Sequence, residues 1–300
     1  MLQDKEQYQN PDYLVDTEWL EQNLDNADLR IFDCTVNVVP NKDIEQAKKL
    51  PFLYQSGRIH FDKEHIPGAG FINIPLELSD ISSIIPLMSP PEKQFINVMR
   101  QHGINDDSHV VLYSASEPNW AARVWWMLKS FGFDNVAILN GGWSKWMMEK
   151  RPITDKSCKY KQGKLTTHHR PDAFVSKNEV LSALSDDGIC IINALPSPIH
   201  TGESDVTFGR KGRISGSVNV PFISLHDPDT GKYLPASVLR KKFDEVHLNA
   251  AEKIITYCGG GVAASNNAFV LSLLGYDNVA VYDGSMLEWG NDESLPMEIG

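Results

Sequence analysis

Short apolar segments alternate with helical patterns along both halves of the chain. In the second half, Lys253–Tyr257 has the length and β-branched content of a buried strand, and residues 262–274 follow it as a helical pattern that ends at Gly275. Residues 278–282 then return as the next strand. This alternation is typical of an α/β fold, in which helices flank a mostly parallel sheet.

The sequence repeats itself after 143 to 148 residues. The matching segments occur in the same order in both halves: 65–75 with 213–221, 110–113 with 254–257, and 132–146 with 275–289. Since this period is far longer than that of a solenoid repeat, we interpret the chain as a duplicated domain.

The duplication predicts two tandem domains, each a mostly parallel sheet flanked by helices. We place the N-terminal domain at residues 1–150, a linker at 151–170 and the C-terminal domain at 171–300. The linker is polar and basic with little periodicity. A chain of 300 residues agrees with two domains of roughly 150 residues each.

Composition and charge narrow the class of protein. The chain is 42% hydrophobic and 22% charged, as in globular proteins, and its net charge of −11 argues against nucleic-acid or anionic-membrane partners. No apolar run reaches the roughly 18 residues of a membrane span, and the first residues lack a secretory core. The four cysteines have neither metal-ligand nor disulfide-scaffold spacing, so we expect a cytoplasmic protein without a metal.

A glycine-rich loop lies between the strand and the helix of the second half. It begins at Cys258 and continues with Gly259, Gly260, Gly261, Val262 and Ala263. The carboxyl end of a parallel strand is where open α/β sheets bind ligands, and the glycines allow main-chain amides to turn inward as an anion nest. With the positive end of the helix, these amides should lower the pKa of the Cys258 thiol and hold an anion bound to its sulfur.

A thiolate in such a loop can accept a sulfur atom, hold it as a persulfide and pass it to a second nucleophile. This ping-pong reaction requires no metal or organic cofactor. The alternative is that Cys258 is a small core residue and the glycines form a plain turn. The strand, loop and helix context favours function for Cys258, whereas we assign the structural role to Cys34, Cys158 and Cys190.

Together these motifs resemble the two-domain sulfurtransferases of the rhodanese superfamily, which include thiosulfate and 3-mercaptopyruvate sulfurtransferases. The resemblance spans nearly the whole chain. It implies two rhodanese-type domains, with the active cysteine in the C-terminal one and the site at their interface. It also implies a small-molecule sulfur donor and a thiol or cyanide acceptor, with thioredoxin among the candidate acceptors.

The first half carries Ser114 where the second carries Cys258. Glu117 and Pro118 follow in its loop, and they would add a negative charge and remove an amide donor. A hydroxyl cannot form a persulfide. We therefore predict that the N-terminal domain is non-catalytic and forms one wall of the site. A hydrolase role for Ser114 would require a G-x-S-x-G elbow, which the loop lacks.

The sulfur donor is less well defined by the sequence. Thiosulfate enzymes of the family place a lysine, and mercaptopyruvate enzymes a serine or threonine, where this chain has Gly260; the family's substrate arginine aligns with Leu195. Substitute cations precede the strand-like residues 217–220 and could bind a carboxylate or sulfonate; they are Arg210, Lys211 and Arg213. The alternative is that these are solvated loop charges.

Other side chains have structural alternatives that we favour. His65 matches a histidine proposed for proton relay in mercaptopyruvate enzymes, but without the loop hydroxyl we expect a structural histidine. Trp146 and Trp289 occupy equivalent repeat positions, which indicates packing. Asp283 and Glu288 follow the last strand and could rim the site, although solvated carboxylates are commoner.

Two other functions remain open at this point. A cysteine phosphatase of related topology needs an arginine about six residues after its cysteine, and that position is Ala264. A non-catalytic rhodanese-like binding or regulatory module would predict loss of the cysteine in both halves, yet Cys258 is present.

Overall fold

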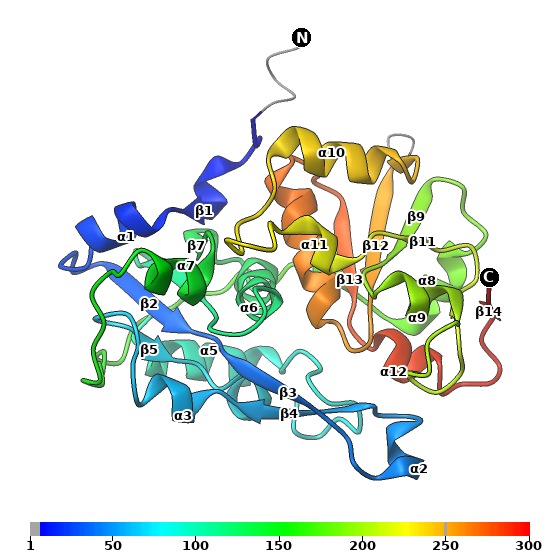
Figure 1. Ribbon diagram of the computed structural model, residues 1–300, viewed down its shortest axis with the longest axis horizontal. Helices are drawn as coiled ribbons and strands as arrows, with labels where there is room; N and C mark the ends of the chain where they lie inside the picture. The colour runs from blue at the N-terminus through cyan, green and yellow to red at the C-terminus, as the bar shows by residue number, and fades with distance from the viewer. Residues whose placement is uncertain (1–6, 249–250) are drawn as a thin grey trace.

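Two five-stranded parallel sheets form the framework of the chain (Figure 1). The structure, a computed structural model, describes residues 7–248 and 251–300; residues 1–6, at the start of the segment expected to lack a secretory core, lie outside it. The first sheet has the order β1 (Leu14–Val15), β7 (Val136–Leu139), β6 (His109–Tyr113), β2 (Leu29–Asp33), β5 (Gly70–Phe71).

The second sheet repeats this arrangement strand for strand. Its order is β8 (Phe174–Val175), β13 (Val279–Tyr282), β12 (Lys253–Tyr257), β9 (Ile189–Asn193), β11 (Val218–Asn219), again all parallel. The predicted fold class, two tandem α/β domains with mostly parallel sheets, is confirmed. The interior strands are almost wholly buried because helices cover both faces, which is why they appear in the sequence as short continuous apolar runs.

Helices follow most strands. Those of the first half are α1 (Thr17–Gln22), α2 (Ile44–Ala47), α3 (Arg58–Phe61), α4 (Ile74–Glu77), α5 (Glu92–Gln101), α6 (Asn119–Ser130) and α7 (Gly142–Met148). Those of the second half are α8 (Lys177–Ala183), α9 (Ser197–Thr201), α10 (Ala236–Asp244), α11 (Val262–Leu273) and α12 (Ser285–Trp289). Short 3₁₀ turns occur at Pro11–Tyr13, Pro171–Ala173 and Phe222–Leu225, and the C-terminal strand β14 (Met297–Glu298) pairs antiparallel with β10 (Arg213–Ile214).

Helices α6 and α11 pack against each other between the two sheets (Figure 1). The helical pattern over 262–274 predicts one apolar face, but every residue of α11 except Ser272 is buried. One side of the helix covers its own sheet and the other covers α6, so the helix has almost no solvent face. The helix therefore lacks the polar face of the amphipathic helix expected at this position, because α6 of the other domain covers that side.

Each domain also covers the end of the other domain's sheet with a loop. In the first half, Ser89 N donates to Asp283 Oδ2 across the interface at 2.6 Å. In the second half, Tyr233 N donates to Asn140 Oδ1 at 3.0 Å. Since Asn140 and Asp283 are equivalent positions of the repeat, the two contacts are counterparts, and the covering is reciprocal.

An antiparallel hairpin extends from the first domain toward the second (Figure 1). It consists of β3 (Val36–Pro40) and β4 (Phe52–Ser56), with α2 at its tip. Near that tip the Lys48 carbonyl accepts hydrogen bonds from Gly209 N at 2.7 Å and Thr207 Oγ1 at 3.1 Å. The hairpin, which the sequence analysis does not predict, thus joins the domains a second time.

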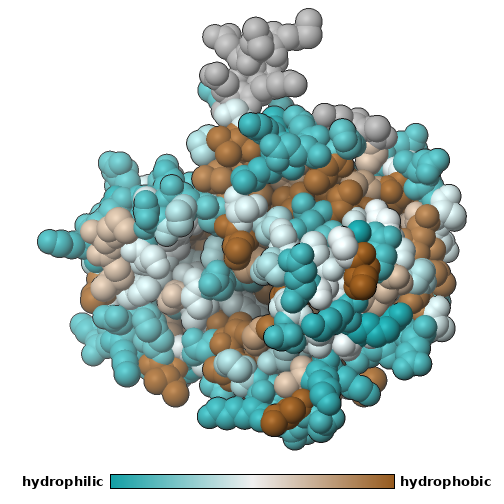
Figure 2. Space-filling view, turned by 45° about the vertical axis from the view of Figure 1, so that its right-hand side comes forward, coloured by the Kyte–Doolittle hydropathy of each residue, from teal (hydrophilic) through white to brown (hydrophobic). Residues whose placement is uncertain are grey.

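The predicted linker, residues 151–170, contains no helix or strand beyond a single bridge between Thr154 and His65. It packs along the first domain, where Tyr160 Oη donates to Gly68 O at 2.6 Å. Among the residues that the structure describes, no helix combines the length and apolar character needed to cross a bilayer. The face shown in Figure 2 is largely hydrophilic, with hydrophobic residues in separate patches.

Candidate functional site

Cys258 follows the last residue of β12, at the carboxyl end of the central strands. Its side chain is only 2% exposed. The Cys258 carbonyl accepts from Met286 N at 3.0 Å, and the next carbonyl, of Gly259, accepts from Leu287 N at 2.8 Å. The start of the loop is therefore bound to the first turn of α12, and the loop then turns into α11.

The amides of this loop fall into two groups. Cys258 N and Gly261 N both donate to Ser285 Oγ, at 3.0 and 3.2 Å. Four further amides donate to no acceptor within the described part of the chain; they belong to Gly259, Gly260, Val262 and Ala263. A buried cluster of free N–H donors is suited to binding an anion, because each amide otherwise lacks a partner.

Two of the three glycines are required by close packing. A Cβ on Gly259 would lie 2.5 Å from the ring of Phe208, and a Cβ on Gly261 would overlap Asp283 Oδ1. Gly261 also has φ +77°, a left-handed conformation that other residues adopt with strain. At Gly260 a Cβ would meet only the flexible end of Leu287, at 3.0 Å.

Residues of both domains enclose the cysteine. Burial raises the pKa of Tyr54, and the nearby Cys258 thiolate raises that pKa further, so the two groups are electrostatic neighbours. The ring of Phe52, also on β4, packs against Phe208 with centroids 6.3 Å apart. On the other side, Pro86 O lies 3.9 Å from the Cβ position of Gly260. The hairpin and the covering loop of the first domain thus close the site.

A cavity of about 330 Å³ lies beside this enclosure. Tyr54 and Pro86, which border the cysteine loop, also line the cavity, so the two spaces share a wall. The rest of the lining is mostly apolar, with Asp80 as an acidic member, and it contains no arginine, lysine or histidine. An anion entering from this side would meet no cation before it reached the loop amides.

A buried ion pair lies beneath the loop. Arg123, on α6 of the first domain, is 0% exposed, and its Nη1 lies 2.6 Å from Asp283 Oδ1. From the sequence, Asp283 is a possible rim residue for which a solvated carboxylate is favoured; its 5% exposure shows that this preference is wrong, because the carboxylate is buried against Arg123. Arg123 itself is not identified from the sequence. The available signal is its position as the single charged residue in the run Trp120–Leu128, written WAARVWWML.

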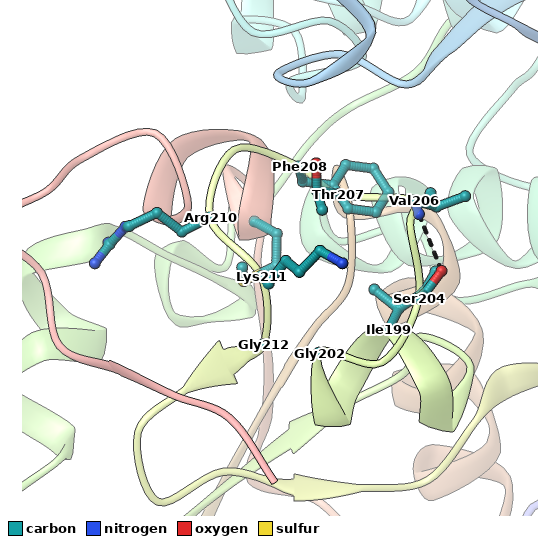
Figure 3. A pocket seen from close by; sticks show the side chains of 10 residues that line it. Ile199, Gly202, Ser204, Val206, Thr207, Phe208, Arg210, Lys211 and Gly212 are labelled. Atoms are coloured by element: carbon teal, nitrogen blue, oxygen red, sulfur yellow. Dashed lines mark hydrogen bonds between the residues drawn. The ribbon is translucent and has the colours of Figure 1, made fainter.

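The Arg210 side chain points toward the C-terminal segment instead of the cysteine loop (Figure 3). Its guanidinium donates to four main-chain carbonyl oxygens, those of Trp289, Gly290, Asp292 and Leu295, at 2.6–3.3 Å. These bonds occupy the guanidinium and fix the chain after α12. From the sequence we expect Arg210 to bind the substrate. In the structure the guanidinium has a structural role instead, because the chain after α12 brings the carbonyl oxygens of residues 289–295 to it.

Arg213 and Lys211 lie apart from the cysteine loop as well. Arg213 Nε donates to Glu298 Oε1 at 2.9 Å, and its Nη1 donates to Gly300 O. Lys211 extends on the opposite side of the chain from Arg210 (Figure 3) and faces Asp205 at 3.4 Å in an exposed pair. In the described part of the chain, neither cation forms a hydrogen bond or ion pair with the cysteine loop, so the substitute clamp expected from the sequence is not assembled.

The remaining candidates have structural contacts. Both ring nitrogens of His65 face carbonyl oxygens, of Phe61 at 2.7 Å and Lys156 at 3.1 Å, and the histidine is 1% exposed. The Trp146 and Trp289 indoles donate to Pro152 O and Pro296 O at 2.8 and 3.0 Å, which is the packing role expected from the repeat.

The corresponding loop of the first domain differs in its amides. Ala115 N donates to Thr35 Oγ1 at 2.8 Å, and Ser116 N donates to Ser114 Oγ at 3.1 Å. These two amides are equivalent to those of Gly259 and Gly260. In the first loop, side-chain hydroxyls accept from these two amides, whereas the amides of Gly259 and Gly260 have no acceptor among the described residues. The first loop therefore offers no comparable anion nest.

Comparison with known proteins agrees with this geometry. A family model described as "Rhodanese-like domain" matches residues 16–149 and 179–292. The chain belongs to the rhodanese family. In this family member, each matched segment contains four of the five strands of one sheet, all except β1 and β8, and Cys258 lies in the second segment.

Relatives that match over nearly their full length include sulfurtransferases. The chain is 31% identical over 288 residues to the 3-mercaptopyruvate sulfurtransferase of Escherichia coli strain K12, covering 95% of this chain and 98% of the relative. It is 30% identical to the thiosulfate sulfurtransferase of Rattus norvegicus, covering 92% and 91%. The crystal structure of the Escherichia coli 3-mercaptopyruvate enzyme SseA superposes with a TM-score of 0.73 at 29% identity, covering 91% and 98%. These similarities support sulfurtransferase activity for the chain.

Proposed function

We propose that this rhodanese moves sulfane sulfur from thiosulfate or 3-mercaptopyruvate to a thiophilic acceptor through a persulfide on Cys258. The observation that carries the proposal is the contrast between the two loops. Beside Cys258, four amides are free to bind an anion, whereas beside Ser114 the amides equivalent to two of them, those of Ala115 and Ser116, are occupied by hydroxyl groups. Only the second loop also has a thiol.

In the first half-reaction the Cys258 thiolate attacks the outer sulfur of the donor. A sulfur–sulfur bond to Cys258 forms as the donor's bond to that sulfur breaks, and its electron pair leaves with sulfite, or with the enolate of pyruvate, which then takes a proton. In the second half-reaction the acceptor attacks the outer sulfur and regenerates the thiolate. The free amides of the loop stabilise the thiolate and the persulfide anion throughout.

The same loop amides must also bind the negatively charged group of the donor. Arg123 is bound to Asp283, Arg210 binds carbonyls, and Arg213 binds Glu298. Without a free guanidinium or ammonium group at the loop, binding of a dianion such as thiosulfate should be weaker than binding of the monoanionic mercaptopyruvate. We therefore expect turnover with mercaptopyruvate to exceed turnover with thiosulfate.

The test is a panel of both donors with cyanide, a small thiol and thioredoxin as acceptors. We expect thiocyanate or sulfide to form, and intact-protein mass spectrometry to show one added sulfur atom after donor treatment without acceptor. The Cys258→Ser variant should lose both signals, and Cys34→Ser should keep them. Persistence of turnover in Cys258→Ser would contradict the proposal.

The low exposure of Cys258 favours a second candidate function, a non-catalytic rhodanese-like binding or regulatory module. Such a module would hold the thiol closed against donor and acceptor alike. It predicts that neither donor adds sulfur to the protein and that iodoacetamide modifies Cys258 no faster than it modifies the fully buried Cys34.

A further inference from the structure

Arg123 is a charged residue of the first domain placed inside the second domain's catalytic framework. Its guanidinium binds Asp283, donates from Nη2 to Leu87 O at 2.7 Å, and lies 5.3 Å from the ring centre of Phe174. The side chain is 0% exposed. A charge buried to this degree requires a partner, and Asp283, 5% exposed, supplies it.

The ion pair reaches the cysteine loop along two routes. Arg123 Nη1 donates to Ser265 Oγ at 3.4 Å, and the Ser265 hydroxyl donates to Gly261 O at 2.7 Å. Asp283 packs directly against Gly261 and leaves no room for a side chain there. Gly261, at the turn from the loop into α11, is thus held from both sides.

Asp283 also fixes the segment that carries Ser285. The Ser285 hydroxyl donates to Tyr282 O at 2.7 Å and accepts from the amides of Cys258 and Gly261. Ser285 adopts φ +47°, a strained conformation for a serine that its surroundings must maintain. Asp283 lies between Tyr282 and Ser285, and its second carboxylate oxygen is held by Ser89 N.

The other half of the molecule provides an internal comparison. By the repeat, Asn140 is equivalent to Asp283, and Asn266 is equivalent to Arg123. Asn140 accepts from Tyr233 N, and Asn266 accepts from the Tyr233 hydroxyl at 2.9 Å. The same framework is therefore built with neutral groups where the loop carries Ser114. Covering and packing alone do not require the ion pair.

We propose that Arg123 and Asp283 form a positioning pair through which the non-catalytic domain holds the Cys258 loop in its reactive geometry. The inference rests on the proposed sulfurtransferase function and extends it to a residue of the first domain. Neither side chain touches the substrate. The pair acts through Gly261 and Ser285, which set where the amides around the thiol point.

The first experiment compares Arg123→Lys with the intact chain, well below the unfolding temperature of either. Lysine keeps the positive charge but cannot bind Asp283, Ser265 and Leu87 O together. We expect kcat to fall at least tenfold while KM for the donor stays within about twofold. The rate at which iodoacetamide modifies Cys258 should also change severalfold, with its pH profile displaced.

The matched control is Asn140→Ala, which removes the corresponding buried polar group at the Ser114 site. It should lower the unfolding temperature without changing kcat or the alkylation profile. Because single loss of Arg123 leaves Asp283 as an unpaired buried charge, a second variant combines Arg123→Gln with Asp283→Asn. This neutral pair should restore the unfolding temperature toward that of the intact chain while kcat stays low.

Three outcomes would overturn the inference: an unchanged alkylation profile in Arg123→Lys, an equal loss of kcat in Asn140→Ala, or full recovery of kcat in the neutral double variant. Failure of the proposed function gives a different result. In that case the intact chain turns over no donor, while the alkylation profiles of the variants still report whether the pair positions the thiol.

Discussion

Gly261 combines two constraints that a single residue rarely carries. Its left-handed φ and the absence of room beside Asp283 both exclude a side chain, whereas Gly260, one position earlier, satisfies neither condition. Local sequence was sufficient to single out Cys258 and its glycines as candidates, because the residues of this loop are consecutive in the chain. It did not identify Arg123, whose partner Asp283 is 160 positions away, or Tyr54, which lies in the other domain and whose pKa is raised by the Cys258 thiolate.

The difference between the two glycines gives a paired prediction. Gly261→Ala should reduce kcat at least tenfold and cost about 1–2 kcal/mol of stability from the left-handed backbone alone. Gly260→Ala displaces only the end of Leu287 and should keep kcat within about threefold. Steady-state kinetics and urea unfolding of both variants check this, and equal losses of kcat would argue against the assignment.

At the scale of elements, the strands and the long loop-to-helix transition could be predicted, since short β-branched runs and a following glycine loop are local signals. The predicted strand at 253–257 appears with the same bounds as β12, and the one at 278–282 appears one residue shorter as β13. The β3–β4 hairpin could not be inferred from the repeat because its matched segments do not include residues 36–56. Yet the hairpin supplies Phe52 and Tyr54, which close the site.

We therefore expect the hairpin to limit access to the thiol. Phe52→Ala removes the ring that packs on Phe208 and should increase the rate of Cys258 alkylation by iodoacetamide about fivefold or more. Val38→Ala, at a side chain 43% exposed on the partner strand, is the control and should leave that rate unchanged. If both variants react like the intact chain, the hairpin does not limit access.

At the scale of the whole molecule, the duplication was visible in the sequence, but the way the halves meet was not. Hydrogen bonds across the interface join residues that are far apart in the sequence. Examples are Ser89 N to the Asp283 side chain and Tyr233 N to the Asn140 side chain. His226 lies next to this interface: its ring packs on Tyr233, whose amide crosses to Asn140, with centroids 4.4 Å apart, and its Nδ1 lies 3.3 Å from Phe222 O.

This contact makes stability depend on pH. Burial lowers the pKa of His226 from 6.5 to about 4, so the folded chain keeps this histidine neutral where the unfolded chain binds a proton. The stability that the neutral His226 contributes is fully present above pH 6.5 and is lost as pH falls toward 4. The total loss in the free energy of unfolding is roughly 3 kcal/mol. Urea unfolding at pH 7.5 and 4.5 should show this loss, and His226→Gln should reduce it; an unaltered pH dependence in that variant would assign the loss to other groups.

The reciprocal covering has a consequence for how such a chain can evolve. On the proposed function, the copy that carries Ser114 can do without a nucleophile because the other copy carries Cys258. It cannot disappear, since its loop and hairpin cover the cysteine loop of its sister. Selection on the sister's chemistry would then maintain the serine-bearing copy, and a shortened descendant would need a new lid before it could discard the old one.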